Sequence, residues 1–357
     1  MNVQQRLERL AARRTDPTIF EAAAKSYESY RTLDVPEAIR YIVGSMQPID
    51  VRYTERTIEQ GRRVRDQLKD RLESGVEYRF QGSVLNDTHI KHHSDIDLLV
   101  LVEKFSFVKK PLEPKYPYHG DTVQDLRDLR KQTREALETA YPAVEIDDSK
   151  SKCIELSGGS LARNVDVVPA AWYDTLEYDR TGEEIHRGVK IFNKSDGSFD
   201  ANYPFKNAAE IDAKDRRCGG GMRKAARFMK TLKADSDVIK LSSYDLAAIA
   251  WNMPDSSLNY EMPWDLKIFY GCRDFVSRLV DDADFRDSIC VPDGSRLVFS
   301  SGHATADGAR SLLAEMDELA SQMSRSVEAN VARELKPSVP EIPIHYPEIV
   351  AHSRIMV

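Results

Sequence analysis

Residues 80–102 read FQGSVLNDTHIKHHSDIDLLVLV, and they place a pair of aspartates at the start of an apolar run. Asp95 and Asp97 are two residues apart, so on a strand their side chains point to the same face. Two ionised carboxylates held this close repel each other, and a cation relieves the repulsion. Oxygen ligands of this kind suit Mg²⁺ or Mn²⁺. An isolated Asp-x-Asp is usually a solvated strand edge, so the surrounding residues decide its meaning.

A Gly-Ser step precedes the aspartate pair. Eleven residues separate Ser83 from Asp95, and Gly82 stands directly before Ser83. Glycine and serine at the end of a strand let backbone amides and a hydroxyl approach a phosphate. The segment therefore combines a phosphate-binding turn with a pair of metal ligands.

Asp166 supplies a third carboxylate in the segment RNVDVVPA, residues 163–170. Alternation along a strand puts it on the face opposite Val165 and Val167. Three carboxylates fit a site for two Mg²⁺ or Mn²⁺ ions that transfers a phosphoryl group. In such a site all three bind metal, and Asp166, placed nearest the attacking hydroxyl, accepts its proton. The chain contains no GxxxxGK[ST] phosphate loop.

Hydrophobic periodicity predicts an α+β fold in which a mixed sheet with helices is followed by a helical domain. Residues 1–74 are predicted to form helices that pack on the catalytic core, and residues 75–205 that core. Residues 206–340 are predicted to form the helical domain that closes a nucleotide cleft. Within it, Ser243 is predicted to cap the helix that begins YDLAAIAW. The Pro-rich residues 341–357 are predicted to be an irregular tail.

The composition is that of an ordinary globular protein, with 41% hydrophobic and 31% charged residues in 357. No apolar run is long enough to span a bilayer, and no secretory signal is visible. The four cysteines lack CxxC spacing, which favours a reducing cytoplasm without structural zinc. A net charge of −7 argues against a stable nucleic-acid partner, because proteins that grip a long nucleic acid usually present a basic surface.

The spacing GS-x11-DxD with a later strand aspartate resembles the polymerase-β-like nucleotidyltransferase superfamily. Within it the chain is similar to the CD-NTases, the bacterial relatives of cyclic GMP-AMP synthase that act in anti-phage defence. Gln81, Thr88, the phrase SDIDLLV and the tract MRKAARFMKTLK followed by LSSYDLAAI carry this closer resemblance. It implies a polymerase-β-like core and an active site in the cleft beside the helical domain.

The resemblance also implies roles for individual residues. Gln81 and Ser83 would contact the donor triphosphate, together with Gly82 of the same turn. Lys230 and Ser243 resemble the family's triphosphate lysine and serine, and Tyr244 its base-stacking aromatic. Residue chemistry agrees, since lysine is a mobile charge, a helix N-terminus attracts anions and tyrosine stacks on any base. Each has a plain structural alternative, namely a solvated helix face for Lys230, an N-cap for Ser243 and core packing for Tyr244.

The predicted function is the synthesis of a cyclic di- or trinucleotide second messenger from ATP, GTP or other NTPs. The family also admits a regulatory protein partner. An alternative keeps the chemistry but transfers the nucleotide to a tRNA, a protein or a small molecule. A further alternative is a degenerate transferase that only senses nucleotides, which the intact acids disfavour. The bases, the linkage and the ring size are left open by the sequence.

Overall fold

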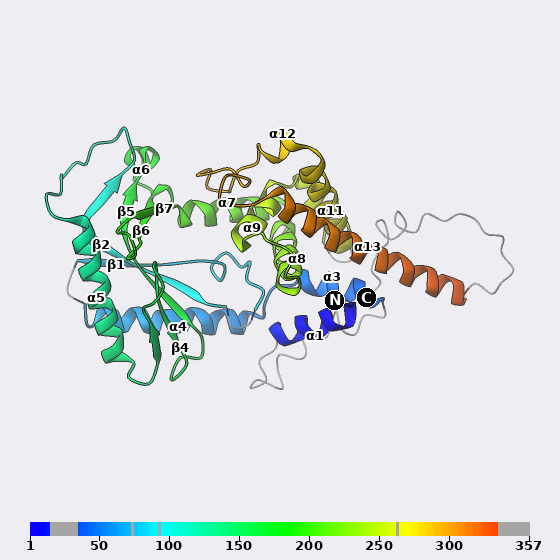
Figure 1. Cartoon of the computed structure of the whole chain (residues 1–357), viewed down its shortest axis with the longest axis horizontal. Helices are drawn as coiled ribbons and strands as arrows, with labels where there is room; N and C mark the ends of the chain where they lie inside the picture. Colours follow the sequence, from blue (N-terminus) through cyan, green and yellow to red (C-terminus); the bar gives the residue numbers. More distant parts are fainter. Residues whose placement is uncertain (15–34, 73–74, 92–93, 262–263, 335–357) are drawn as a thin grey trace. The chain divides into compact units, whose positions relative to one another are not determined.

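The chain divides into two compact units in the computed structural model (Figure 1). We call Val51–Glu210 the sheet unit, and Met1–Asp50 with Ile211–Val357 the helical unit. The structure describes residues 1–14, 35–72, 75–91, 94–261 and 264–334, so the predicted tail at 341–357 lies outside the described residues. No helix within these ranges is both long and apolar enough to cross a membrane.

The sheet unit is built on a mixed sheet, as predicted. Its spatial order is β1-β2-β5-β4-β3, with β6 pairing with β5 and β7 with β6. Only β2 and β5 run parallel among these pairs. The strands are β1 (Val76–Gln81), β2 (Ile96–Val108), β3 (Glu145–Asp147), β4 (Ile154–Ser157), β5 (Val165–Asp174), β6 (Gly188–Phe192) and β7 (Phe199–Asn202).

Strand β2 is buried on both faces because its side chains alternate between two cores. Leu98 and Val100 join the larger cluster, whereas Leu99 and Leu101 pack with Trp172 on the other face. Burying each such leucine or valine contributes roughly 1.5–3 kcal/mol. This explains why the central strand reads as a continuous apolar run, as strands covered on both faces do.

Helices α4 (Val51–Lys69) and α5 (Thr122–Ala140) cover the larger of the two cores (Figure 1). Their buried residues include Val64 and Leu68 of α4 and Leu126 of α5, which pack with β2 and β5. The 19-residue α5 begins at Asp121, whose side chain accepts hydrogen bonds from two backbone amides of the first turn. The sheet unit is completed by α6 (Leu176–Thr181) and the short 3-10 helix η1 (Glu184–His186).

The helical unit surrounds one large apolar core. Its longest described helices, α11 and α13, pack against each other, and α8 packs against α9. The elements are α1 (Val3–Arg14), α3 (Glu37–Met46), α7 (Pro204–Arg217), α8 (Gly221–Asp235), α9 (Ser243–Asn252), α10 (Asp255–Leu258), α11 (Asp265–Asp281), α12 (Ala283–Arg286) and α13 (Ala306–Glu334). The division from the sheet unit falls inside α7. The predicted C-terminal helices are therefore present.

Residues 1–74 are divided between the two units. Helices α1 and α3 belong to the helical unit, and only α4 belongs to the sheet unit. The physical reason is a buried polar link: Arg13 donates two hydrogen bonds, at 2.6 and 2.7 Å, to the carboxylate of Asp235 at the end of α8. The hydroxyl of Tyr41 on α3 donates a third, at 2.7 Å. These contacts fasten the chain's first helices to elements more than 190 residues later.

Candidate functional site

Strand pairing brings the aspartates of the sheet unit together. Asp97 on β2 and Asp166 on β5 are direct partners in the parallel register. By strand alternation Asp97 shares the face of Leu99, and Asp166 that of Val168, whose side chains pack together in the smaller core. Asp95 stands immediately before β2. The three predicted carboxylates thus lie at one end of two adjacent strands.

Gly82 makes a close backbone approach to this group. It follows β1, and its φ of +100° is a conformation that side chains rarely adopt. A Cβ at this position would collide with the Oδ2 atom of Asp97. Glycine is therefore required here both by the turn and by the carboxylate beside it.

Ser83 lies in a hydrogen-bonded turn that follows Gly82. The Thr88 amide donates to the Ser83 carbonyl at 3.0 Å, and the Asn86 amide donates to Gly82, which closes the turn. Gln81 is the register partner of Asp97, and its side-chain oxygen accepts a hydrogen bond from Asn202 at 3.3 Å. Gln81 and Gly82 thus lie beside Asp97, and Ser83 follows them in the turn.

The carboxylates hold a concentration of negative charge. Burial, with Asp166 and Asp95 nearby, raises the pKa of Asp97 to about 7. Partial burial and the neighbouring Glu155 raise the pKa of Asp95, although its side chain still reaches solvent. Burial, with Asp95 and Glu155 nearby, raises the pKa of Asp166. Such perturbed groups gathered on one face are typical of a functional site.

Two residues that lie beside the aspartates were not predicted from the sequence. Glu155 on β4 is the register partner of Asp166, and Lys150 in the preceding turn pairs with Glu155 and lies 4.0 Å from the Asp166 carboxylate. Alternation along β4 puts Glu155 on the face opposite Ile154, so the strand pattern of this segment is the signal that could have found it. Lys150, in the polar run DDSKSK, carried no such signal.

The donor set fits a divalent cation in chemistry. Carboxylate oxygens are the ligands that Mg²⁺ and Mn²⁺ prefer, and the pKa values, raised first by burial and then by neighbouring carboxylates, indicate a negative charge that a cation would offset. In the described part of the chain, no three Asp, Glu, His or Cys side chains are already gathered into a metal-binding cluster. The ligands therefore share a face and a chemistry, and a bound ion would have to draw them together.

Lys230 lies on α8 of the helical unit and is only 6% exposed. Burial, with Arg227 and Lys233 nearby, lowers its pKa to about 7. Contact with a phosphate would favour the charged form. Lys224 on the same helix instead pairs at 2.8 Å with Asp265, which is fully buried. Lys230 is therefore not part of a solvated helix face, whereas Lys224 has a structural partner.

Ser243 is not the N-cap of α9, contrary to the prediction. Ser242 takes that position: its hydroxyl accepts from the Asp245 amide, and the Asp245 carboxylate accepts from the Ser242 amide. This reciprocal capping box satisfies the first amides of the helix. Ser243 is the first helical residue and its side chain is exposed. Its hydroxyl is therefore not used to start the helix.

Tyr244 is held by a polar network as well as by the core. Its hydroxyl donates to the Asp293 carboxylate at 2.5 Å, and the Arg296 guanidinium lies 5.4 Å from the ring centre. The ring is half-buried against the apolar core of the helical unit. Core packing is thus part of its role, and its orientation is fixed by the loop that carries Asp293.

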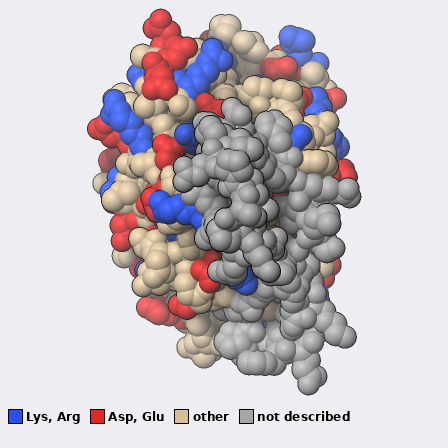
Figure 2. All heavy atoms as spheres, turned by 90° about the vertical axis from the view of Figure 1, so that its right-hand side faces the viewer, with Lys and Arg blue, Asp and Glu red and all other residues tan. Residues whose placement is uncertain are grey.

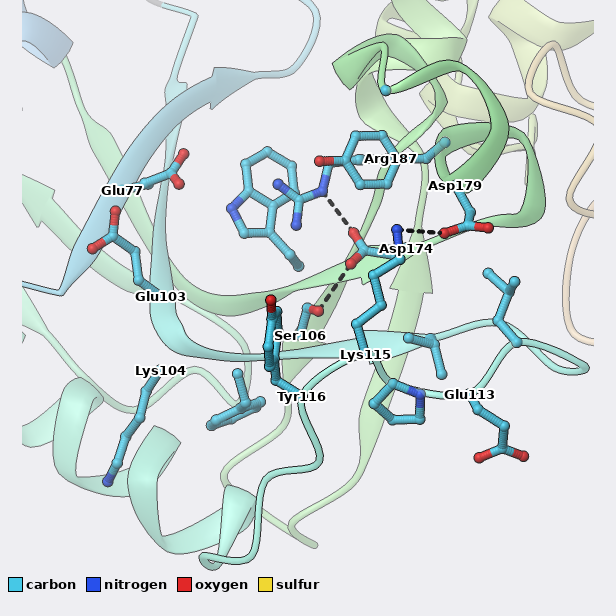
Figure 3. Close-up of a pocket in the computed structure, with 17 residues that line it drawn as sticks. Glu77, Glu103, Lys104, Ser106, Glu113, Lys115, Tyr116, Asp174, Asp179 and Arg187 are labelled. Atoms are coloured by element: carbon cyan, nitrogen blue, oxygen red, sulfur yellow. Dashed lines mark hydrogen bonds and ion pairs between the residues drawn. The ribbon is translucent and has the colours of Figure 1, made fainter.

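A separate cavity of about 620 Å³ lies in the sheet unit (Figure 3). It is lined at the far ends of β2 and β5 by Ser106 and Asp174, away from Asp97 and Asp166. Asp174 accepts hydrogen bonds from Ser106 at 2.9 Å and from Arg187 at 2.7 Å. Asp174 is thus paired, and the cavity is distinct from the carboxylate site.

Charges of both signs are interspersed on the described residues of the face drawn in Figure 2. No single basic patch dominates that view. This agrees with the net charge of −7 and does not favour a long nucleic acid as ligand there.

Comparisons with known proteins identify the family. The family model for a nucleotidyltransferase domain matches residues 62–171, which contain all three aspartates. The chain is 38% identical over 267 residues to the cyclic dinucleotide synthase CdnE of Yersinia aleksiciae, over 73% of this chain and 70% of that protein. It is 32% identical over 285 residues to a c-di-GMP synthase of a Lachnospiraceae bacterium, over 72% and 81% respectively.

The fold is shared with solved structures. A STING-associated CdnE c-di-GMP synthase from Capnocytophaga granulosa superposes with a TM-score of 0.76 at 28% identity, over 92% of this chain and 100% of that one. A CdnE c-UMP-AMP synthase from Rhodothermus marinus shares the fold at 19% identity, with a TM-score of 0.61 over 77% and 93%. Because of these sequence identities and the shared fold, the chain belongs to the CdnE family of cyclic dinucleotide synthases, within the nucleotidyltransferases.

Proposed function

We propose that this protein condenses two GTP molecules into cyclic di-GMP and releases pyrophosphate. The observation that carries the reaction class is the register of Asp97 with Asp166 beside the Gly82-Ser83 turn. Support for the product comes from relatives at 32% and 29% identity that are c-di-GMP synthases.

In this proposal each residue of the sheet unit has a defined task. Ser83 and the amides of its turn bind the donor triphosphate, with Gln81 beside them. Asp166 accepts the proton of the attacking ribose hydroxyl, while the bond from the α-phosphorus to the leaving pyrophosphate breaks. Asp95, Asp97 and Asp166 would hold two Mg²⁺ or Mn²⁺ ions, which supply charge stabilisation and acidify the hydroxyl.

Three residues of the helical unit complete the proposal. Lys230 and Ser243 would contact the triphosphate, the first through its charge and the second through a hydroxyl not used in capping. Tyr244 would stack on a base, with its ring fixed through Asp293. We further propose that the product is a messenger in cytoplasmic anti-phage signalling, with a regulatory protein as a partner. The Capnocytophaga granulosa relative is described as STING-associated, which supports a signalling role.

The first test identifies the product. Purified protein with GTP alone and Mg²⁺ or Mn²⁺, but without template or acceptor, should release pyrophosphate and form a dinucleotide that phosphatase does not degrade. A ring has no terminal phosphate, whereas a linear intermediate has one. Chromatography and mass spectrometry of phosphatase-treated reactions give the readout, and reactions with each other NTP and each pair of NTPs serve as comparison.

The outcomes separate the alternatives. A ring built from other bases would overturn the choice of GTP but keep the reaction class. Products that form only when a tRNA, protein or small-molecule acceptor is added would overturn the cyclic product. Nucleotide binding without pyrophosphate release, with a regulatory partner present or absent, would indicate a sensor.

A second test uses the pKa of Asp97, which burial and nearby carboxylates raise to about 7. In the metal-free folded protein Asp97 therefore keeps its proton up to about pH 7, whereas in the unfolded chain it releases the proton near the ordinary aspartate pKa. The stabilisation that the bound proton gives the folded state is lost as the pH rises through about 7. A divalent ion must displace the same proton. We expect saturating Mn²⁺ to raise the melting temperature more at about pH 8 than at about pH 6. Thermal unfolding with and without Mn²⁺ measures this, and an equal or larger shift at the lower pH would contradict it.

A further inference from the structure

The turn between β3 and β4 directs one cation at the carboxylate site. The ammonium of Lys150 pairs with the Glu155 carboxylate and lies 4.0 Å from Oδ1 of Asp166. Within the described ranges, no other basic side chain forms an ion pair with Asp95, Asp97 or Asp166. Among the described residues, Lys150 is therefore the one basic side chain within ion-pair distance of these aspartates, although Lys91 acts on Asp95 from farther away.

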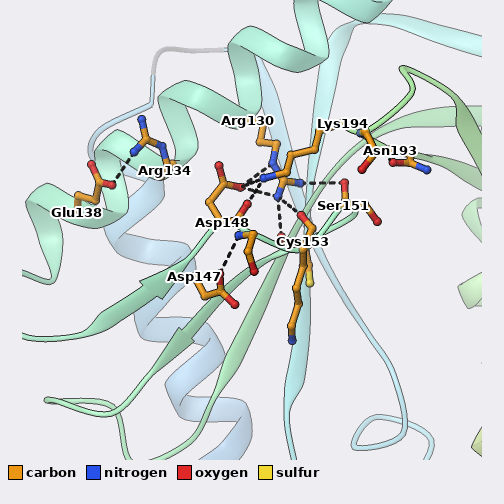
Figure 4. A network of polar contacts seen from close by, with 12 residues as sticks. Arg130, Arg134, Glu138, Asp147, Asp148, Ser151, Cys153, Asn193 and Lys194 are labelled. Atoms are coloured by element: carbon orange, nitrogen blue, oxygen red, sulfur yellow. Dashed lines mark hydrogen bonds and ion pairs between the residues drawn. The ribbon is translucent and has the colours of Figure 1, made fainter.

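The position of this lysine is fixed by a buried arginine. Arg130 on α5 is 4% exposed, and its guanidinium donates to the carbonyls of Lys150 and Cys153, both at 2.7 Å (Figure 4). The turn is also tied to the next strand pair, because the Lys194 amide donates to the Ser151 carbonyl at 3.0 Å. A loop with its carbonyls held this way presents its side chains reproducibly. The backbone of Lys150 is thus held in place, while its side chain remains about half exposed.

The ammonium of Lys150 lies within ion-pair distance of two carboxylates, those of Glu155 and Asp166. Strand pairing sets Asp166 beside both Asp97 and Glu155, so the positive charge of Lys150 offsets part of the negative charge gathered here. A divalent ion would perform the same offset and would need the same oxygen atoms.

We propose that Lys150 is a resident counter-cation of the metal-free site, and that a divalent ion must displace its ammonium from Asp166 in order to bind. This inference rests on the proposed function, because it assumes that the aspartates bind metal. The Glu155 carboxylate already pairs with Lys150 and would remain a partner for the displaced ammonium. Lys150 would thereby raise the concentration of free metal that the site requires.

The test measures metal binding without nucleotide or turnover. Mn²⁺ is titrated into the full-length wild type, Lys150→Met and Lys150→Arg, with free Mn²⁺ followed by electron paramagnetic resonance. The control is Lys152→Met, because Lys152 stands in the same turn and pairs with Asp200 at 2.8 Å. Both lysines are about half exposed, at 45% and 51%, so neither substitution should unfold the protein, which thermal unfolding verifies.

We expect Lys150→Met to bind Mn²⁺ about fivefold more tightly than the wild type. This factor corresponds to the interaction free energy of two unit charges about 4 Å apart in water. Lys150→Arg should bind like the wild type, and Lys152→Met within about twofold of it. Asp97→Asn defines the background of unrelated binding.

Three results would overturn the inference. Unchanged or weaker binding in Lys150→Met would mean that the lysine only orients Asp166. Equal tightening in Lys152→Met would mean that any positive charge in the turn has the same effect. Wild type that binds no more Mn²⁺ than Asp97→Asn would remove the proposed metal site itself, so the two failures are distinguishable.

Discussion

Asp97→Asn should reduce cyclic dinucleotide formation by at least about a thousandfold, the effect of losing several kcal/mol of charge stabilisation at the reacting phosphate. The reason is its position: Asp97 is the central carboxylate, paired in register with Gln81 on one side and Asp166 on the other. Asparagine has the same shape but carries no charge, so the fold should persist. At about pH 8 the metal-free variant should melt above the wild type, because the buried charge is gone.

Product formation and thermal unfolding are measured on the same preparations. The matched control is Asp128→Asn, an exposed aspartate on α5 that accepts a hydrogen bond from Gln124. It should leave both quantities unchanged. Near-normal synthesis by Asp97→Asn with Mg²⁺ or Mn²⁺ would refute the assignment of the catalytic carboxylates.

Asp166→Asn should block the chemical step far more than nucleotide binding. If Asp166 accepts the proton of the attacking hydroxyl, its loss lowers turnover by about 10²–10⁴-fold. Binding of a non-hydrolysable GTP analogue should stay within about threefold of the wild type, because in the proposed site the Ser83 turn would hold the donor phosphates. Turnover from product formation and affinity from calorimetry give the two numbers.

The comparison of these two numbers decides the role. Glu145→Gln on β3, an exposed acid of the same sheet, is the control and should change neither. A loss of affinity that matches the loss of rate would assign Asp166 to holding the nucleotide's metal ion instead of moving a proton.

The carboxylate site was predictable because it is encoded locally. The alternation of side chains along a strand fixes the sheet face on which Asp97 and Asp166 lie. Their pairing as neighbours in the sheet is not local, since it depends on which strands lie side by side. The resemblance to a known family supplied that step, and the mixed sheet agrees with it.

The contacts that were not predictable join distant parts of the chain. The link from Arg13 to Asp235 spans 222 residues, and nothing in the periodicity of either helix indicates its partner. The same holds for Arg130, which reads as one charge on an amphipathic helix but holds the turn of Lys150. The N-cap of α9 was predicted one residue too late, at Ser243 instead of Ser242, because either serine fits the residue preference of an N-cap.

The two serines at the start of α9 differ in how closely each is tied to the helix. Ser242 caps the helix, and Ser243 leaves its hydroxyl exposed and uncommitted to the cap. Exchanging Ser243 for another polar side chain would alter what the helix offers to a ligand without removing the cap. If Ser243 contacts the triphosphate as proposed, nucleotide binding and helix stability depend on two adjacent residues and can change separately.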